Sequence, residues 1–242
     1  MNSLISASGK TQPPWIRRLL LPAYQVKDAA KYATISAQTI LNWQKTYSGN
    51  NATISRREDG QLLSYLQLIE VAVVAAMRDA GVSLNAIREA REYMSARLKA
   101  EYPFAQHAFK TDGKNIIMKF TDFEKDESKD KLIIVNKGGQ LGWNAILEEK
   151  LKEFEYHKGT GVANKWHLRG SSSSIVIDPQ VSFGAPAIKG IPTWTIKGRL
   201  DAGESIDDIA DDFSLKKMDV KKALEFEGVD VTKIDNAVEW NH

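Results

Sequence analysis

The sequence predicts an α+β protein with a winged helix-turn-helix near its N-terminus, a small β-rich middle region, and a three-helix unit with a second helix-turn-helix near its C-terminus. Apolar residues recur at the i, i+3, i+4 spacing of amphipathic helices in both terminal thirds, and this periodicity is lost over residues 102–177. A serine tract at 171–174 has the composition of a linker. We therefore expect three domains, at 1–100, 101–174 and 175–242.

Two short helices are predicted in the N-terminal domain. Apolar residues at helical spacing predict the first helix over 26–32. Ser36 is a favourable N-cap for a second helix over 37–44, in which Ile40 and Trp43 face inward. Two helices around a short turn form a helix-turn-helix, whose second helix presents its first residues to base edges in the DNA major groove.

The outward face of this second helix carries amides and hydroxyls. Asn and Gln side chains can bond adenine through two hydrogen bonds, and hydroxyls can reach phosphates or bases. The residues expected to contact DNA here are Ser36, Gln38, Thr39, Asn42 and Lys45. The alternative is a plain helical hairpin whose polar side chains face solvent.

A wing is predicted next. Arg56 and Arg57 precede the turn signal Asp59-Gly60, a pattern typical of a short wing beside a recognition helix. We expect both arginines to contact phosphates or an adjacent minor groove.

Two longer helices follow the wing. The first is predicted over 65–80 and ends at Gly81, and Ser83 caps the second. The apolar face of the second helix is either part of a homodimer interface or an internal core face, and it carries Leu84, Ile87, Ala90, Tyr93, Met94 and Leu98.

This segment resembles the MerR-type winged helix-turn-helix. The matching residues are Tyr24, Val26, Ala29, Ala30, Thr39, Ile40 and Trp43, followed by Gly81-Val82-Ser83-Leu84 and Ile87-Arg88. The match covers about residues 22–99 and departs from the family in the wing, where Leu62-Leu63-Ser64-Tyr65 replaces the usual arginine-leucine-tyrosine run. The resemblance implies a DNA-binding fold.

The middle domain is predicted to contain a hairpin over 108–120, a strand over 131–135 and a further strand over 151–156. Its histidines lack the spacing of metal ligands, and its glycines lack the strand-to-helix context of a phosphate loop. We interpret this domain as a spacer or a dimerisation module, and we expect no metal, cofactor or catalytic site.

The C-terminal domain is predicted to contain helices over 195–201, after Ser205, and over 217–227. The last helix presents a basic patch within an acidic segment, where phosphate binding and a solvated helix face are equal alternatives. The patch consists of Lys216, Lys217, Lys221 and Lys222.

This domain resembles one catalogued as domain of unknown function 433 and found in bacterial antitoxins. The residues that carry the resemblance are Gly184, Pro186, Ile188, Gly190, Thr193, Ala202-Gly203-Glu204-Ser205, Ile209-Ala210, Phe213, Val220, Ala223 and Leu224. The whole arrangement is similar to long VapB-type antitoxins. That resemblance implies a PIN-like ribonuclease toxin as partner.

Composition limits the function classes. Residues 1–100 carry thirteen basic and seven acidic residues, and residues 171–242 carry eight basic and thirteen acidic residues. A basic N-terminal third favours double-stranded DNA as partner, although a basic solvated surface is the alternative. The chain has no cysteine, no apolar run long enough to span a membrane and no signal-peptide pattern, so we expect a cytoplasmic protein.

The leading hypothesis is therefore an antitoxin that represses its own operon and neutralises a toxin. The alternative is a MerR-like regulator that responds to a small-molecule effector. An enzyme is the weakest hypothesis, because no acid–base pair, nucleophile triad or metal motif stands in a recognisable context.

Overall fold

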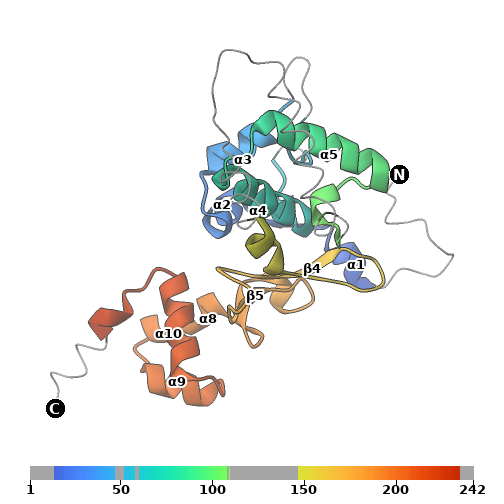
Figure 1. The fold of residues 1–242 in the computed structure, drawn as a ribbon. Helices are drawn as coiled ribbons and strands as arrows, with labels where there is room; N and C mark the ends of the chain where they lie inside the picture. The colour runs from blue at the N-terminus through green and yellow to red at the C-terminus, as the bar shows by residue number, and fades with distance from the viewer. Residues whose placement is uncertain (1–13, 47–51, 58–59, 108, 110–146, 235–242) are drawn as a thin grey trace. The chain divides into compact units, whose positions relative to one another are not determined.

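The computed structural model describes residues 14–46, 52–57, 60–107, 109 and 147–234. The chain divides into two compact units, Met1–Trp166 and His167–His242, and each is described by itself (Figure 1). Helices and small antiparallel sheets are both present, which confirms the predicted α+β class. Within the described residues, no helix is both long enough and apolar enough to cross a membrane.

Helices α2 (Val26–Ala33) and α3 (Ala37–Trp43) are joined by a short turn. The side-chain oxygen of Ser36 accepts the N–H of the third residue of α3 at 3.0 Å, so the predicted N-cap is confirmed. Ile40 and Trp43 are buried as predicted, and they fix which face of α3 points outward.

Helix α4 (Tyr65–Asp79) lies at the centre of the first unit, and every residue of its first thirteen is buried. Ser64 and Gln67 begin it with a capping box, in which the Gln67 side chain accepts the Ser64 N–H at 2.8 Å. A helix that is apolar all round belongs in a core. Gln67 and Glu70 are exceptions to this apolar character, and Glu70 is fully buried.

Helix α5 (Leu84–Leu98) begins at the predicted cap, Ser83, whose side chain accepts a backbone N–H at 3.1 Å. Ile87 and Met94 are buried inside the unit, whereas Tyr93 is exposed. Much of the predicted apolar face of α5 is therefore internal core.

Short elements complete the edges of this part of the unit. They are α1 (Pro14–Arg18), β1 (Pro22–Tyr24), β2 (Leu63–Ser64) and the 3-10 turn η2 (Pro103–Ala105). Strands β1 and β2 pair antiparallel, and η2 packs against α4 and α5.

A helix over 147–152 leads into the hairpin of β3 (Phe154–Tyr156) and β4 (Ala163–His167). The two strands are antiparallel, with Phe154 opposite Trp166. The indole N–H of Trp166 donates to the buried carboxylate of Glu153 at 2.9 Å.

The strand predicted over 151–156 is therefore wrong in its first half. Leu147 and Leu151 are four residues apart and both are buried, as one face of a helix requires. Strand pairing begins only at Phe154. An alternating pattern of only six residues could not distinguish the end of a helix from the start of a strand.

The histidines of the first unit pack against aromatic rings. His107 lies against Tyr156 with ring centroids 5.2 Å apart, and His157 lies against Trp15 at 4.7 Å. Among the residues that the structure describes, no group of potential ligands that could hold a metal ion comes together.

The second unit places a small sheet before three helices. Its elements are β5 (Ile175–Ile177), the 3-10 turn η3 (Ser182–Gly184), β6 (Ala187–Ile188), β7 (Ile191–Pro192), α8 (Thr193–Asp201), α9 (Ile206–Asp212) and α10 (Lys217–Phe226). Strand β6 pairs antiparallel with both β5 and β7. The three helices pack on one another.

The starts of two helices in this unit can be compared with the predicted ones. Ser205 caps α9 as predicted, by accepting a backbone N–H at 3.1 Å. Helix α8 begins two residues earlier than predicted, because Pro192 ends β7 and serves as the N-cap, and the Thr193 hydroxyl bonds the carboxylate of Glu227.

The serine tract at 171–174 forms part of a turn that leads into β5. The N–H of Leu168 donates across this turn to the carbonyl of Ile175 at 2.9 Å. The predicted strand over 131–135 and most of the hairpin over 108–120 lie outside the described residues. The three-domain division stays a prediction.

Candidate nucleic-acid interface

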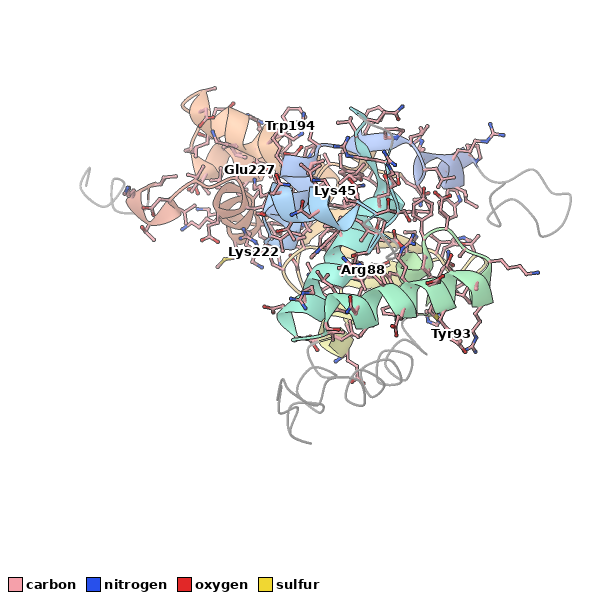
Figure 2. The ribbon with its side chains drawn as sticks, turned by 90° about the horizontal axis from the view of Figure 1, so that it is seen from above. Lys45, Arg88, Tyr93, Trp194, Lys222 and Glu227 are labelled. Carbon is pink, nitrogen blue, oxygen red and sulfur yellow. The ribbon has the colours of Figure 1, made fainter. Side chains whose placement is uncertain are left out.

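Helix α3 forms a ridge on the surface of the first unit. Its core-facing residues Ile40 and Trp43 are buried, and Gln38 and Asn42 are exposed, as is Lys45 just after the helix (Figure 2 labels Lys45). The Gln38 amide donates to the Asn42 carbonyl oxygen at 3.0 Å, which fixes the two side chains relative to each other. Both amides expected to read bases are thus on the outward face.

A groove runs along one side of this ridge, with a volume of about 540 Å³. Among the described residues, three of its lining side chains are cationic and none is acidic. We call this hollow the basic groove, and it is lined by Gln38, Leu41, Gln44, Lys45, Thr46, Arg56 and Arg57. The structure therefore brings four of the predicted site residues together, and their chemistry suits a polyanion.

A larger cleft of about 1020 Å³ lies on the other side of the ridge. Its floor is formed by small residues of α4, namely Ala72, Ala75 and Ala76, while Thr39 and Asn42 line it from α3. Both charge signs occur in its lining, from Arg78, Asp79, Arg88, Glu149, Lys150 and Glu153. The predicted contact residues are thus divided between two hollows of different charge.

Ser36, the remaining predicted contact residue on α3, caps the helix. Its hydroxyl lies 2.8 Å from the Thr39 hydroxyl and accepts the Thr39 N–H. Ser36 therefore defines where α3 begins.

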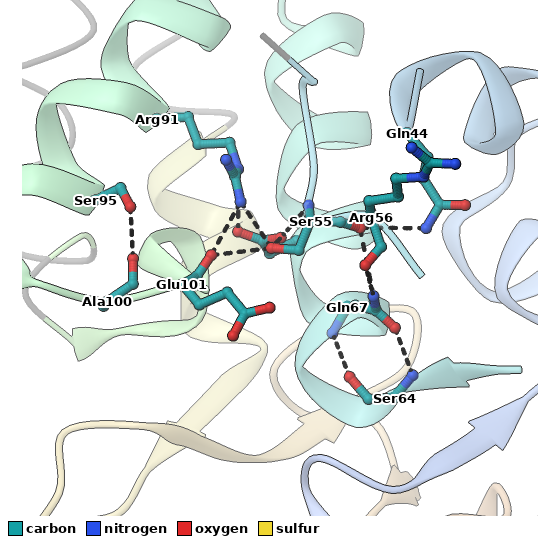
Figure 3. A network of polar contacts seen from close by, with 10 residues as sticks. Gln44, Ser55, Arg56, Ser64, Gln67, Arg91, Ser95, Ala100 and Glu101 are labelled. Carbon is teal, nitrogen blue, oxygen red and sulfur yellow. Dashed lines mark hydrogen bonds and ion pairs between the residues drawn. The ribbon is translucent and has the colours of Figure 1, made fainter. Parts of the chain in front are cut away.

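The backbone ahead of the two arginines is held by side-chain amides (Figure 3). Gln44, at the end of α3, donates to the carbonyl of Ser55 at 3.2 Å. Gln67, on α4, donates to the carbonyl of Arg56 at 3.0 Å. Two helices therefore determine the course of the chain at the point where it enters the basic groove.

The carboxylate of Glu70 anchors the same segment from inside. One of its oxygens accepts the backbone N–H of Ser55 at 2.8 Å and lies 2.7 Å from the Ser55 hydroxyl. The Arg91 guanidinium from α5 lies 3.6 Å from the other oxygen, and it donates to the Ser55 hydroxyl at 2.7 Å and to the carbonyl of Glu101 at 2.9 Å. We call Ser55, Glu70, Arg91 and the Glu101 carbonyl the Ser55 junction.

Burial raises the pKa of Glu70 above its ordinary value of 4.5. Arg91 and the hydrogen bonds from Ser55 act in the opposite direction and do not cancel the effect of burial. The carboxyl group of Glu70 therefore holds its proton to a higher pH in the folded protein than in the unfolded chain.

The C-terminal lysines lie in a different electrostatic setting. Lys216 and Lys222 are exposed, Lys221 is half-buried, and Lys217 forms an ion pair with Asp207 at 2.7 Å. Helix α9 supplies acidic residues to the same unit, at Asp207, Asp208, Asp211 and Asp212. Its carboxylates offset the lysine charge, unlike the lining of the basic groove.

Sequence reasoning missed the Ser55 junction and the cleft. Glu70 marked only the edge of an apolar run, although a carboxylate inside a helix with no polar face is itself a signal of a buried partner. Its partners are Ser55 and Arg91, which are far from it in sequence and which no local pattern connects to it.

Comparison with known proteins gives a match to a family model and a likeness to a solved structure. Residues 175–226 match a family model described as a protein of unknown function, DUF433, which confirms the predicted resemblance of that segment. The fold is similar to the X-ray crystal structure of Rv2018 from Mycobacterium tuberculosis, with a TM-score of 0.65 and 20% identity over 86% of this chain and 99% of that chain. No curated protein matches.

We expect Glu70→Gln to change how stability depends on pH. Because its pKa is raised in the folded protein, Glu70 contributes to the free energy of unfolding a stabilisation that is fully present below its ordinary pKa of 4.5. This stabilisation is lost as pH rises through the pKa of the folded state. Urea unfolding at pH 4 to 8 should therefore show the variant gaining stability relative to the wild type as pH rises. Glu92→Gln, at an exposed carboxylate of α5, is the control, and a difference that is constant with pH would contradict the assignment.

Proposed function

We propose that this chain is a DNA-binding antitoxin of a type II toxin–antitoxin pair, which represses its own operon and neutralises a PIN-like ribonuclease toxin. The observation that carries the proposal is the exposed ridge of α3, which places two amides beside a groove lined by three cations. In this proposal α2 and α3 are the helix-turn-helix of a MerR-like winged domain.

The proposed DNA complex follows from the chemistry of the ridge. Helix α3 enters the major groove, where Gln38 and Asn42 bond adenines. Lys45, Arg56 and Arg57 neutralise phosphates of the strand that borders the basic groove. The lysines of α10 are a weaker candidate for DNA, because α9 brings carboxylates close to them.

The second unit is the proposed toxin-binding part. Its match to the DUF433 model and its resemblance to antitoxins support this assignment. Aromatic anchors contribute much of the binding energy at protein interfaces, and two exposed aromatic side chains are available for this role here: Trp194 is 63% exposed and Phe183 is 91% exposed (Figure 2 labels Trp194). Phe183 has a φ of 54°, a strained backbone conformation of the kind that clusters at binding sites.

We propose a cytoplasmic homodimer without cofactor or catalytic site, since one helix-turn-helix gains useful affinity when two copies bind adjacent half-sites. Ile87 and Met94 are committed to the core of the protomer. The dimer contact is therefore assigned to other surfaces than the buried stripe of α5.

A second candidate function is a MerR-like regulator that responds to a small molecule, and the cleft favours it. The cleft is as large as typical ligand pockets. The buried Nε of Arg88 in its lining has no hydrogen-bond partner among the described residues. A ligand bound there would contact Thr39 and Asn42 on the recognition ridge.

We predict that Arg56→Ala with Arg57→Ala weakens binding to every duplex. Two lost phosphate contacts should make the slope of log affinity against log salt shallower by about 2. Fluorescence titration of a labelled duplex at several salt concentrations measures this slope. Arg17→Ala with Arg18→Ala removes the same charge from exposed positions on α1 and should have a smaller effect. An unchanged slope in the first variant would place the wing away from DNA.

We predict that Gln38→Ala or Asn42→Ala lowers specificity more than affinity. Each amide is expected to contribute about 1–3 kcal/mol of discrimination between the correct and the wrong base. The measurement compares an operator selected from random duplexes with an unrelated duplex. Lys45→Ala should weaken both complexes equally. Full discrimination in both amide variants would show that α3 is not the recognition helix.

We predict that the tagged full-length chain co-purifies with the product of an adjacent reading frame and restores growth inhibited by that product. Phe183→Ser with Trp194→Ser should reduce this capture and leave operator binding unchanged, because the two functions are assigned to different units. Operator binding that responds to an organic anion, without a toxic neighbour, would instead support the second candidate function.

A further inference from the structure

We propose that Glu70 and Arg91 are positioning residues of the basic groove, through which α5 controls the arginines that bind phosphate. This inference rests on the proposed DNA-binding function. It deepens that function, because neither residue lines the groove and the sequence assigns no role to either.

Ser55 occupies the position in the chain just ahead of the two arginines. Ser55 directly precedes Arg56 and Arg57, and both its N–H and its hydroxyl are within hydrogen-bond distance of one oxygen of Glu70. Gln67 holds the next carbonyl, that of Arg56. The backbone is thus anchored immediately before the pair of cations, which limits where their side chains can reach.

The position of Ser55 also depends on α5, through Arg91. Arg91 donates to the Ser55 hydroxyl, and it also donates to the Glu101 carbonyl beyond the end of α5 (Figure 3). It is the only cation in the Ser55 junction. A displacement of α5 therefore moves the partner of a carboxylate that has no access to water, so Ser55 must move as well.

The Ser55 junction affects the position of Ser55 more than the stability of the fold. A buried ion pair is often no more stabilising than well-packed apolar residues of similar volume. The hydrogen bonds that Ser55 makes to Glu70 and accepts from Arg91 do, however, define one geometry, because donors and acceptors must meet at fixed distances and angles. The Ser55 junction therefore offers the chain little stability that Leu or Met could not supply, but it specifies the position of Ser55.

The test uses the full chain with Glu70→Gln combined with Arg91→Met. Removing both charges together leaves no unpaired buried charge, so the variant is expected to fold. We expect the Ser55 amide to exchange its hydrogen about tenfold faster than in the wild type, since its anchored acceptor is weakened. We also expect the salt slope of DNA binding to become shallower by about 2, as in the double arginine variant.

Coupling separates positioning from general damage. In the Arg56→Ala, Arg57→Ala background the junction variant should have no further effect on DNA binding, because the residues it positions are gone. Ser83→Ala removes the N-cap of α5 and is the structural control, expected to lower stability without altering the slope.

The outcomes are distinct. An unchanged slope, or an additive loss in the arginine-free background, overturns the inference. A wild-type chain that binds no duplex overturns the proposed function, and the exchange rate at Ser55 then decides whether the junction holds this segment. Retained protection of that amide in the variant overturns the inference in either case.

Discussion

The buried carboxylate of Glu70 is the constraint on which the N-terminal unit depends. Helix α4 is enclosed on all sides, so a charged or polar atom on it can be satisfied only by protein groups. Those groups are Ser55, just ahead of Arg56 and Arg57, and Arg91 from α5, which in turn donates to the Glu101 carbonyl after α5. One desolvated carboxyl group thereby links, directly or through Arg91, three segments that are distant in sequence, and the groove that borders α3 is built on one of them.

The ridge of α3 results from a different and more local balance. A hydroxyl cap sets where the helix begins, and two large apolar residues set its rotation. The amides are exposed as a consequence. In the second unit the same local rules operate, but Arg199 is held by Glu204 and by Asp212, the latter at 2.6 Å, and it lies over the ring of Phe213. Charges there neutralise one another within the unit, whereas the described residues that line the basic groove carry positive charge only.

Much of the fold could be predicted because its signals are local. Ser36, Ser83 and Ser205 cap the helices that follow them, and apolar spacing identified the buried faces of α3 and α4. The segment over 147–156 could not be predicted, because a short alternating run is compatible with both a helix and a strand. The candidate site was only partly predictable: the outward residues of α3 follow from helical geometry, but their division between the basic groove and the cleft depends on α4 and α5.

If α3 binds DNA as proposed, the bond between Gln38 and Asn42 has a consequence for the energetics of base recognition. Long amide side chains on a helix surface usually sample several rotamers, and ordering them on binding costs about 0.5–1.5 kcal/mol each. Here the two amides are already linked at 3.0 Å, so part of that entropy is lost during folding. The same link means that an arriving base has to exchange one hydrogen bond for another. The two amide side chains are thus already ordered before a base binds. Only a base that replaces the lost hydrogen bond with one of good geometry gains binding enthalpy from the exchange.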